Sequence, residues 1–223
     1  MIQSRETVGW GNLCSEYPIR IVDNCTLEHF ANEQDYEGGT LIDSAKKFKQ
    51  NTRALGLFLR HLDEQRSIYI TGPVLDEMVG SHFNYTKSIK RLNRDDVSPE
   101  ERRDWLVLFR QYRDFLKVKR KLKQGFVFQG DVLEFDDVEK ETYDYFAKRN
   151  APLRLEYGLS VPDFDLLVSG ATLSRRRGKT AICSNDFGIL RSWKALLKKE
   201  RISPKLLGFF IRQNFHEFES AVA

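Results

Sequence analysis

Short apolar segments rich in β-branched residues alternate with longer helical patterns along this chain of 223 residues. Strands are expected at residues 19–22, 67–71 and 180–183, with a further short strand at 201–203. Helical patterns occupy about residues 41–62, a segment starting at Pro73, residues 98–123, 134–149, 160–173 and 187–199, and a closing helix from Pro204. Parallel neighbours in a sheet need crossover connections, which are usually helices. The alternation therefore predicts an α/β fold with a central, mostly parallel sheet.

The length and composition favour one folded domain spanning residues 1–223. Hydrophobic residues make up 41% of the chain and charged residues 30%, which is ordinary for a globular protein and excludes a low-complexity chain. Charge becomes dense between residues 84 and 125. This segment contains Ser98-Pro-Glu-Glu101, a capping box with proline at the first helical position. We interpret residues 84–125 as a charged helical insertion within the domain.

The cysteines and the hydropathy bear on where the protein resides. Cys14, Cys25 and Cys183 are odd in number and widely spaced, which favours a reducing compartment, and they offer no pattern typical of a zinc site. No apolar run reaches the ~18 residues of a membrane span, and residues 1–7 are too polar for a signal peptide. We therefore expect a cytoplasmic protein without a membrane partner.

Basic residues are concentrated in two runs, although the net charge is only +4. Runs of this kind favour contact with phosphate groups, and a solvated helix face or loop is the alternative explanation. The candidates for phosphate contact in these runs are Lys117, Lys119, Arg120, Lys121, Arg175, Arg176, Arg177 and Lys179.

Acidic residues occur where the predicted strands end or where the neighbouring helices begin. Asp23 and Asp186 follow two strands, Glu77 lies one turn into a helix, and Asp163 and Asp165 open another helix. Ligands of open parallel sheets bind outside the carboxyl ends of the strands, so these acids are expected at one edge. Clustered carboxylates repel one another unless a cation neutralises them, and their oxygen atoms suit Mg²⁺ or Mn²⁺. Such a centre would favour hydrolysis of phosphate esters.

Each acid also has a simpler explanation. Asp23 could be a turn residue or helix cap, and Glu77 could be a solvated acid in the first turn of a helix. Asp163 lies three residues after Ser160, so it could complete a capping box. Asp165 is directly followed by Leu166-Leu-Val168, and its helix therefore soon enters the core.

Taken in order, these segments resemble the four motifs of the PIN domain, a family of metal-dependent nucleases with an α/β/α fold. The strand ending at Asp23 resembles the first motif, and Ile68-Tyr-Ile-Thr-Gly-Pro-Val-Leu-Asp-Glu77 resembles the second. Thr71, Val74 and Glu77 fall at the three-residue steps of that motif. The third and fourth motifs resemble Asp165-Leu-Leu-Val-Ser-Gly-Ala171 and Ala181-Ile-Cys-Ser-Asn-Asp186. The resemblance covers roughly residues 1–83 and 134–210.

The resemblance implies a three-layer α/β/α fold in which Asp23, Glu77, Asp165 and Asp186 bind Mg²⁺ or Mn²⁺ and form the catalytic site. Ser184 would support it by orienting an acid or a water molecule. Asp163 could bind metal beside Asp165 or instead of it. The family often has Asn two positions after its first Asp, where this chain has Cys25.

The implied function is a metal-dependent ribonuclease, and the long insertion favours processing of structured RNA. In this interpretation the basic residues of 117–123 and 175–179 would hold the RNA backbone. Two alternatives stay open within the resemblance. One is a toxin-type endoribonuclease restrained by an antitoxin-like protein, and the other is a non-catalytic scaffold or RNA-binding protein. PIN domains often dimerise, so the resemblance also allows a homodimer or a higher homo-oligomer.

Overall fold

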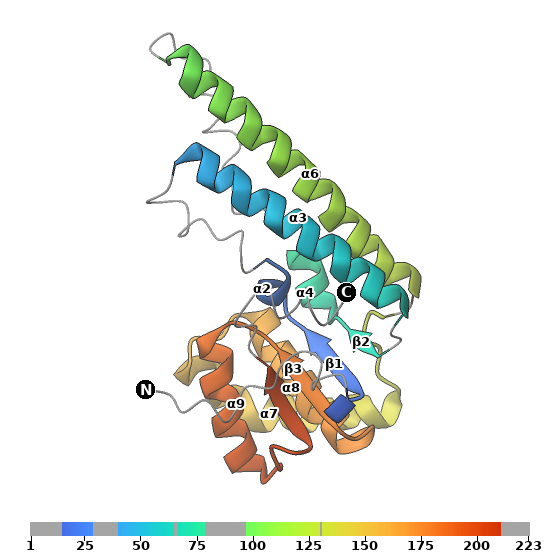
Figure 1. Cartoon of the computed structure of the whole chain (residues 1–223). Coiled ribbons are helices and arrows are strands. Elements are labelled where there is room, and N and C mark those ends of the chain that lie inside the picture. The colour runs from blue at the N-terminus through green and yellow to red at the C-terminus, as the bar shows by residue number, and fades with distance from the viewer. Residues whose placement is uncertain (1–14, 29–39, 65–66, 79–96, 130, 211–223) are drawn as a thin grey trace.

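A four-stranded, all-parallel sheet lies at the centre of the computed structural model, which describes residues 15–28, 40–64, 67–78, 97–129 and 131–210 (Figure 1). The strand order is β2-β1-β3-β4. The strands are β1 (Ile19–Val22), β2 (Ile68–Tyr69), β3 (Thr180–Cys183) and β4 (Leu207–Phe210). The predicted α/β fold with a parallel sheet is therefore confirmed.

The first strand along the chain occupies an inner position in the sheet. Ile21 pairs with Tyr69 of β2 on one side and with Ile182 of β3 on the other. The chain thus leaves β1 toward one neighbour and later returns to its opposite side, which makes the β1/β3 boundary the point where the strand order reverses.

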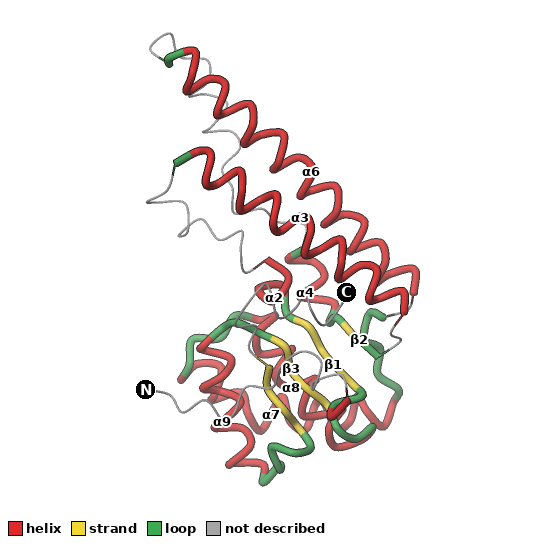
Figure 2. The backbone as a smooth tube through the Cα atoms, in the orientation of Figure 1, coloured by secondary structure: helices red, strands yellow, loops and turns green. Residues whose placement is uncertain are grey.

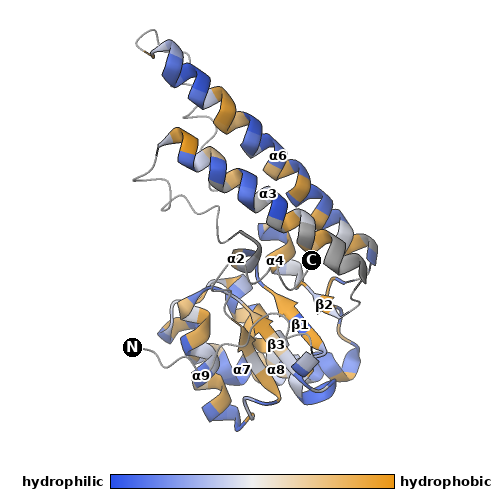
Figure 3. Cartoon of the chain, viewed as in Figure 1, coloured by the Kyte–Doolittle hydropathy of each residue, from blue (hydrophilic) through white to orange (hydrophobic). Residues whose placement is uncertain are grey.

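Helices cover both faces of the sheet because neighbouring strand residues point to opposite faces. Ile21 and Ile182 pack with α7 (Asp137–Glu156), α8 (Val161–Arg176) and α9 (Phe187–Glu200). Val22 and Cys183 belong to the other hydrophobic cluster, which includes α3 (Leu41–Glu64), α4 (Gly72–Glu77) and α6 (Pro99–Gln129). The apolar colouring of the strands in Figure 3 agrees with this two-sided burial.

Helices α3 and α6 pack side by side and extend away from the sheet as an arm (Figure 1). Phe48 of α3 contacts Tyr112 and Phe115 of α6, with ring centroids 5.3 and 5.6 Å apart. Gly125 lies where the two helices approach, because a Cβ there would be 3.1 Å from Cδ1 of Leu59. This approach accounts for a glycine inside the helix, which continues to Gln129 rather than ending near residue 123.

The projecting arm does not coincide with the predicted insertion at residues 84–125. Residues 84–96 lie outside the described residues, and the helix that begins at Pro99 packs along α3, which precedes the predicted insertion. The projecting unit therefore consists of α3 and α6 together.

Most predicted elements are present, and the clearest differences are near residue 204 (Figure 2). Residues 201–206 form neither the predicted short strand nor the start of the closing helix. The fourth strand is instead Leu207–Phe210, and its packing requires glycine because a Cβ at Gly208 would overlap the Tyr17 ring. The short helix α2 (Asn24–Glu28) was not predicted.

No helix in the described parts of the chain combines the length and apolar character that crossing a bilayer requires.

Candidate functional site

Asp23 lies at the carboxyl edge of the sheet, directly after β1. Its backbone N–H donates to the carbonyl of Cys183 at 2.9 Å, so the pairing of β1 with β3 continues to the ends of both strands. This continuation brings Asp23 beside Ser184, and on the other side the register of β1 and β2 leads toward Thr71. The edge therefore carries polar residues from three adjacent strands where the strand order reverses.

The Asp23 side chain is only 4% exposed, and it is held by two donors. Its Oδ2 accepts hydrogen bonds from Oγ of Ser184 and from Sγ of Cys25, both at 2.7 Å. Burial raises the pKa of Asp23, the two hydrogen bonds oppose that rise, and the negative charge of Asp163 adds to it. The result is a fixed, buried carboxylate whose ionised form would be favoured by a cation.

Ser184 connects two of the predicted acids. Its hydroxyl donates to Asp23 and accepts a hydrogen bond from the backbone N–H of Asp186 at 3.1 Å. The side chain of Asp186 caps α9 by accepting hydrogen bonds from the N–H groups of Gly188 and Ile189. Ser184 thus links the Asp23 carboxylate to the backbone of Asp186, while the Asp186 side chain serves as a helix cap.

Cys25 is a member of this group that the sequence did not predict. Its thiol donates to Asp23 and accepts from the N–H of Asn185 at 3.1 Å. Burial and the neighbouring carboxylate raise the pKa of Cys25, so the group remains a thiol that can donate to Asp23. The sequence feature that could have indicated this role is its position two residues after Asp23, where the PIN family often has Asn.

Asp163 and Asp165 have different hydrogen-bond partners. Asp163 completes the capping box of α8 with Ser160, as the simpler explanation predicted, and it is close enough to Asp23 to raise the pKa of that group. Asp165 accepts a hydrogen bond of 2.6 Å from the hydroxyl of Tyr143 on α7. Burial and this contact raise the pKa of Tyr143, which keeps its hydroxyl protonated as a donor.

Glu77 is exposed at the end of α4, a helix that contacts α2 and α8. Among the residues that the structure describes, no three Asp, Glu, His or Cys side chains form a group able to hold one ion. The predicted assembly of Asp23, Glu77, Asp165 and Asp186 into one such group is therefore not observed. The hydrogen bonds of Asp165 to Tyr143 and of Asp186 to α9 direct these carboxylates to other partners.

Two further oxygen atoms at this edge have no hydrogen-bond partner among the described residues. Oδ1 of Asn24 and Oγ1 of Thr71 are both buried, and Thr71 begins α4 without capping it through its side chain. A buried polar atom without a partner is costly, and a bound group that interacts with it would offset the cost. Neither atom was predicted as part of the site.

These oxygen atoms fit a divalent cation that keeps several water ligands better than one whose ligands all come from the protein. Mg²⁺ usually keeps several water ligands and needs only one or two carboxylates from the protein. Asp23 and Asp163 supply two carboxylates that interact electrostatically. Asn24 and Thr71, which follow the adjacent strands β1 and β2, add two neutral oxygen atoms. The donor set is thus all oxygen, as Mg²⁺ and Mn²⁺ prefer.

The first basic run lies on α6, where its members differ in exposure. Lys117, Arg120 and Lys121 are exposed, and Lys117 contacts Asp114 at 3.7 Å. Lys119 is only 3% exposed, and burial lowers its pKa to about 8. Its inclusion among RNA-binding residues is therefore wrong, because it lies on the buried stripe of α6 rather than on the solvent face.

The second basic run lies at the opposite edge of the sheet from Asp23. Helix α8 begins beside the acids and ends at Arg175 and Arg176, roughly 15 Å from Asp165 at 1.5 Å per residue. Arg177 binds both carboxylate oxygens of Glu139, at 2.6 and 2.7 Å, and is therefore held in an ion pair. Lys179 is exposed at the start of β3.

Comparison of this chain with protein-family models, with curated proteins and with solved structures finds no match.

Proposed function

We propose that the chain is a metal-dependent ribonuclease with a PIN-like, three-layer α/β/α architecture. The observation that carries this proposal is the buried Asp23 carboxylate, held by Ser184 and Cys25 at the point where the strand order reverses. Burying an ionised carboxylate is costly, so its retention with two dedicated donors is typical of a functional site. The parallel sheet with helices on both faces is compatible with the architecture.

Asp23 and Asp163 are the residues proposed to hold Mg²⁺ or Mn²⁺, with Asn24 and Thr71 as neutral oxygen donors. When bound, the ion would lower the pKa of a water molecule and neutralise charge on the scissile phosphate. Glu77 and Asp165 are proposed to act on the substrate outside the metal-binding group, from helices α4 and α8, which contact each other. Asp165 would do so while accepting its hydrogen bond from Tyr143. The ionised state of Asp23 is the one that this role requires.

The surrounding residues would act by fixing that carboxylate. The hydrogen-bond chain from the Asp186 N–H to the Ser184 hydroxyl and on to Asp23 sets the position of Oδ2. Cys25 donates to the same oxygen and remains protonated because it is buried. Ser184 and Cys25 are therefore positioning residues in this proposal.

The exposed side chains of Lys117, Arg120 and Lys121 would hold the backbone of a structured RNA along the arm. Double-stranded RNA is recognised mainly by shape and backbone contacts, for which a long helix with exposed cations is suited. This placement supports processing of structured RNA as the preferred form of the activity.

A cleavage assay on end-labelled RNAs, including a transfer RNA precursor, tests the proposal. Wild-type protein should cut with Mn²⁺ or Mg²⁺ and fail to cut with EDTA, and Asp23→Asn should be inactive. Asp137→Asn is the matched control, because Asp137 is exposed on α7 and forms a surface ion pair with Lys140. Equal activity of wild type and Asp23→Asn would overturn the assignment of the site.

Metal binding has a readout that does not depend on activity. An ion that binds only the folded state raises its stability, so millimolar Mn²⁺ should raise the Tm of wild type but not of Asp23→Asn. A metal-dependent rise without cleavage of any RNA would favour the non-catalytic alternative. Cleavage products ending within single-stranded messages would favour the toxin-type alternative over RNA processing.

A further inference from the structure

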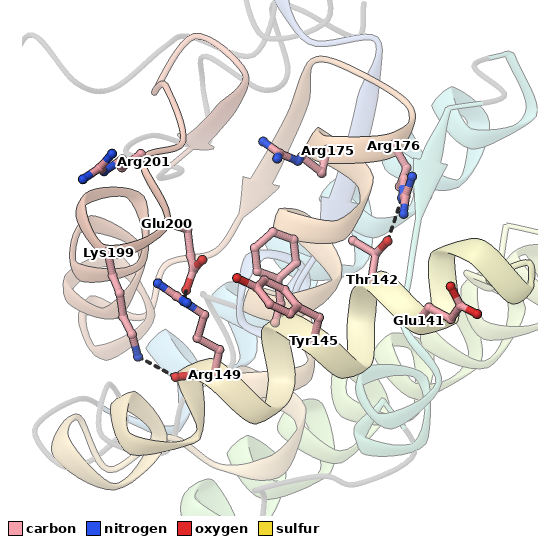
Figure 4. Close-up of a pocket in the computed structure, with 10 residues that line it drawn as sticks. Glu141, Thr142, Tyr145, Arg149, Arg175, Arg176, Lys199, Glu200 and Arg201 are labelled. Carbon is pink, nitrogen blue, oxygen red and sulfur yellow. Dashed lines mark hydrogen bonds and ion pairs between the residues drawn. The ribbon is translucent and has the colours of Figure 1, made fainter.

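A strongly basic pocket lies at the amino edge of the sheet, away from Asp23. It has a volume of about 760 Å³ and is formed by α7 together with the carboxyl ends of α8 and α9 (Figure 4). Its cations are Arg149, Arg175, Arg176, Lys199 and Arg201. The pocket also contains two carboxylates, so its lining has a net charge of +3.

The acidic residue deepest in this lining is already neutralised. The side chain of Glu200 is 5% exposed and accepts hydrogen bonds from Nε of Arg149 and Nδ2 of Asn150, both at 3.0 Å. Lys199 donates to the carbonyl of Arg149. Arg149 and Lys199 thus stabilise the packing of α7 against α9.

The remaining cations are available to a ligand. Arg175 and Arg201 make no hydrogen bond or ion pair through their side chains within the part of the chain that is described. Arg176 donates from Nε to the Thr142 hydroxyl at 2.6 Å, which orients its guanidinium without neutralising it. The neighbouring Arg177 differs from them, because its Nε and Nη2 both donate hydrogen bonds to the Glu139 carboxylate.

Helix dipoles explain only part of this arrangement. Cations near the carboxyl ends of α8 and α9 interact favourably with the helix dipole, which is a stabilising effect on any exposed helix end. The dipole effect requires neither a pocket at the helix ends nor an aromatic ring in that pocket. Tyr145 lies in the pocket with 54% of its surface exposed, and the guanidinium of Arg149 lies 5.8 Å from the centre of its ring.

We propose that this pocket binds a nucleotide, with the phosphate held by Arg175, Arg176 and Arg201 and the base stacked on Tyr145. Guanidinium groups match phosphate geometry, and base stacking on aromatic rings tolerates any base. The volume lies within the usual range for small-molecule pockets. The nucleotide is either free or part of a single-stranded RNA, since both present the same phosphate and base. This site is independent of the proposed ribonuclease centre.

Calorimetric titration of the full chain in EDTA tests the pocket without involving the metal-dependent edge. The probes are uridine 5′-monophosphate, a short oligouridylate and inorganic phosphate. We expect both nucleotide probes to bind more tightly than inorganic phosphate, and the tighter of the two identifies the source of the ligand. We expect Arg175→Ala and Arg201→Ala each to weaken binding roughly tenfold. Tyr145→Leu should also weaken binding, while Tyr145→Phe should behave as wild type.

Arg103→Ala is the matched control, because it removes an exposed arginine on α6 outside the pocket. Asp23→Asn should bind the probes as wild type does, so failure of the ribonuclease proposal is distinguishable from failure of this one. Protection of Arg175 and Arg201 from phenylglyoxal by the bound nucleotide gives a second readout on unmodified protein. No binding, equal binding by Arg175→Ala, or no preference over inorganic phosphate would overturn the proposal.

Discussion

Asp23 illustrates a conflict between stability and function at one side chain. Its carboxylate is buried, and the hydrogen bonds from Ser184 and Cys25 only partly offset the desolvation that raises its pKa. A group whose pKa is higher in the folded chain binds a proton more tightly there. Its ionised form therefore reduces the free energy of unfolding at neutral pH, and this penalty fades as the pH falls.

Replacing Asp23 with Asn should consequently stabilise the protein while abolishing the proposed activity. Asn keeps the shape and an acceptor oxygen but carries no charge. We expect the Tm at pH 7 to rise by roughly 2–4 °C, which corresponds to about 1 kcal/mol in a chain of this size. The gain should shrink as the pH is lowered, because protonation of the wild-type carboxyl removes the buried charge. A lower Tm than wild type at pH 7 would contradict this account.

The buried positive charge of Lys119 likewise lowers the free energy of unfolding. Burial lowers its pKa to about 8, so the folded chain binds this proton less tightly than the unfolded chain does. The penalty is complete below pH 8 and disappears as the pH rises toward the ordinary lysine value near 10.

Lys119→Met removes this titrating group, so the free energy of unfolding of the variant relative to wild type should be lower at about pH 10 than at pH 7, by roughly 1–3 kcal/mol. Lys121→Met is the control, because Lys121 lies two residues further along α6 and is exposed. RNA affinity should be unchanged in Lys119→Met and reduced in Lys121→Met. Loss of RNA binding in a folded Lys119→Met variant would restore Lys119 to the RNA-binding surface.

The elements with strong local signals were predicted well. Ser160 and Ser98 begin α8 and α6 as their capping patterns indicated, and β1 and β3 have the expected bounds. Local signals failed for β4, because Leu207–Phe210 becomes a strand by pairing with β3 and packing on Tyr17. They also failed for Gly125, whose place inside α6 depends on contact with another helix.

The candidate site was predictable in position but not in composition. The strand ends predicted that Asp23 and Asp186 would lie at one edge. The register brings the ends of β1 and β3 together, and Ser184 is the residue that contacts Asp23 there. The partners of Asp165 and Cys25 depend on side-chain directions that spacing does not determine, as the contact of Asp165 with Tyr143 shows. Charge density likewise could not separate buried Lys119 from its exposed neighbours.

Glu139 joins two helices through one carboxylate. It completes the capping box at the start of α7 and also binds Arg177 at the end of α8. Arg177 lowers the pKa of Glu139, so the ion pair stabilises the folded chain above the ordinary glutamate pKa and is lost as the pH falls through the lowered value.

Arg177→Ala should reduce the free energy of unfolding by about 2 kcal/mol at pH 7, because Glu139 is left buried without its charged partner. The loss should become small in strong acid, where Glu139 is protonated in both proteins. Urea denaturation at several pH values measures this dependence. Lys179→Ala, which changes an exposed cation nearby, should leave stability nearly unchanged.

The whole molecule separates its charged features in space. The acids lie at the carboxyl edge of the sheet, and the basic pocket lies at the amino edge. The exposed cations of α6 lie on the arm that this helix forms with α3. Contacts with phosphate groups release counterions, so the arm should contribute a salt-dependent part of RNA affinity.

Changing Lys117, Arg120 and Lys121 together to Glu should weaken binding of structured RNA and reduce its dependence on salt. If each cation contacts one phosphate, the slope of log K against log salt should fall by roughly 2–3. A charge-matched variant at exposed positions on α7 and α9, with Lys140, Lys148 and Lys198 changed to Glu, should alter the slope much less. Equal slopes in both variants would show that the arm has no specific role.

The inner position of β1 has a consequence for how the chain is made. A ribosome releases β1 first, yet Asp23 and its partner Ser184 are 161 residues apart in the sequence. Until β3 emerges, the apolar residues of Ile19–Val22 lack the neighbour that pairs with them through all four positions. Nascent chains that stall before residue 180 would therefore expose an unpaired strand edge, which makes them substrates for chaperones and prone to aggregation.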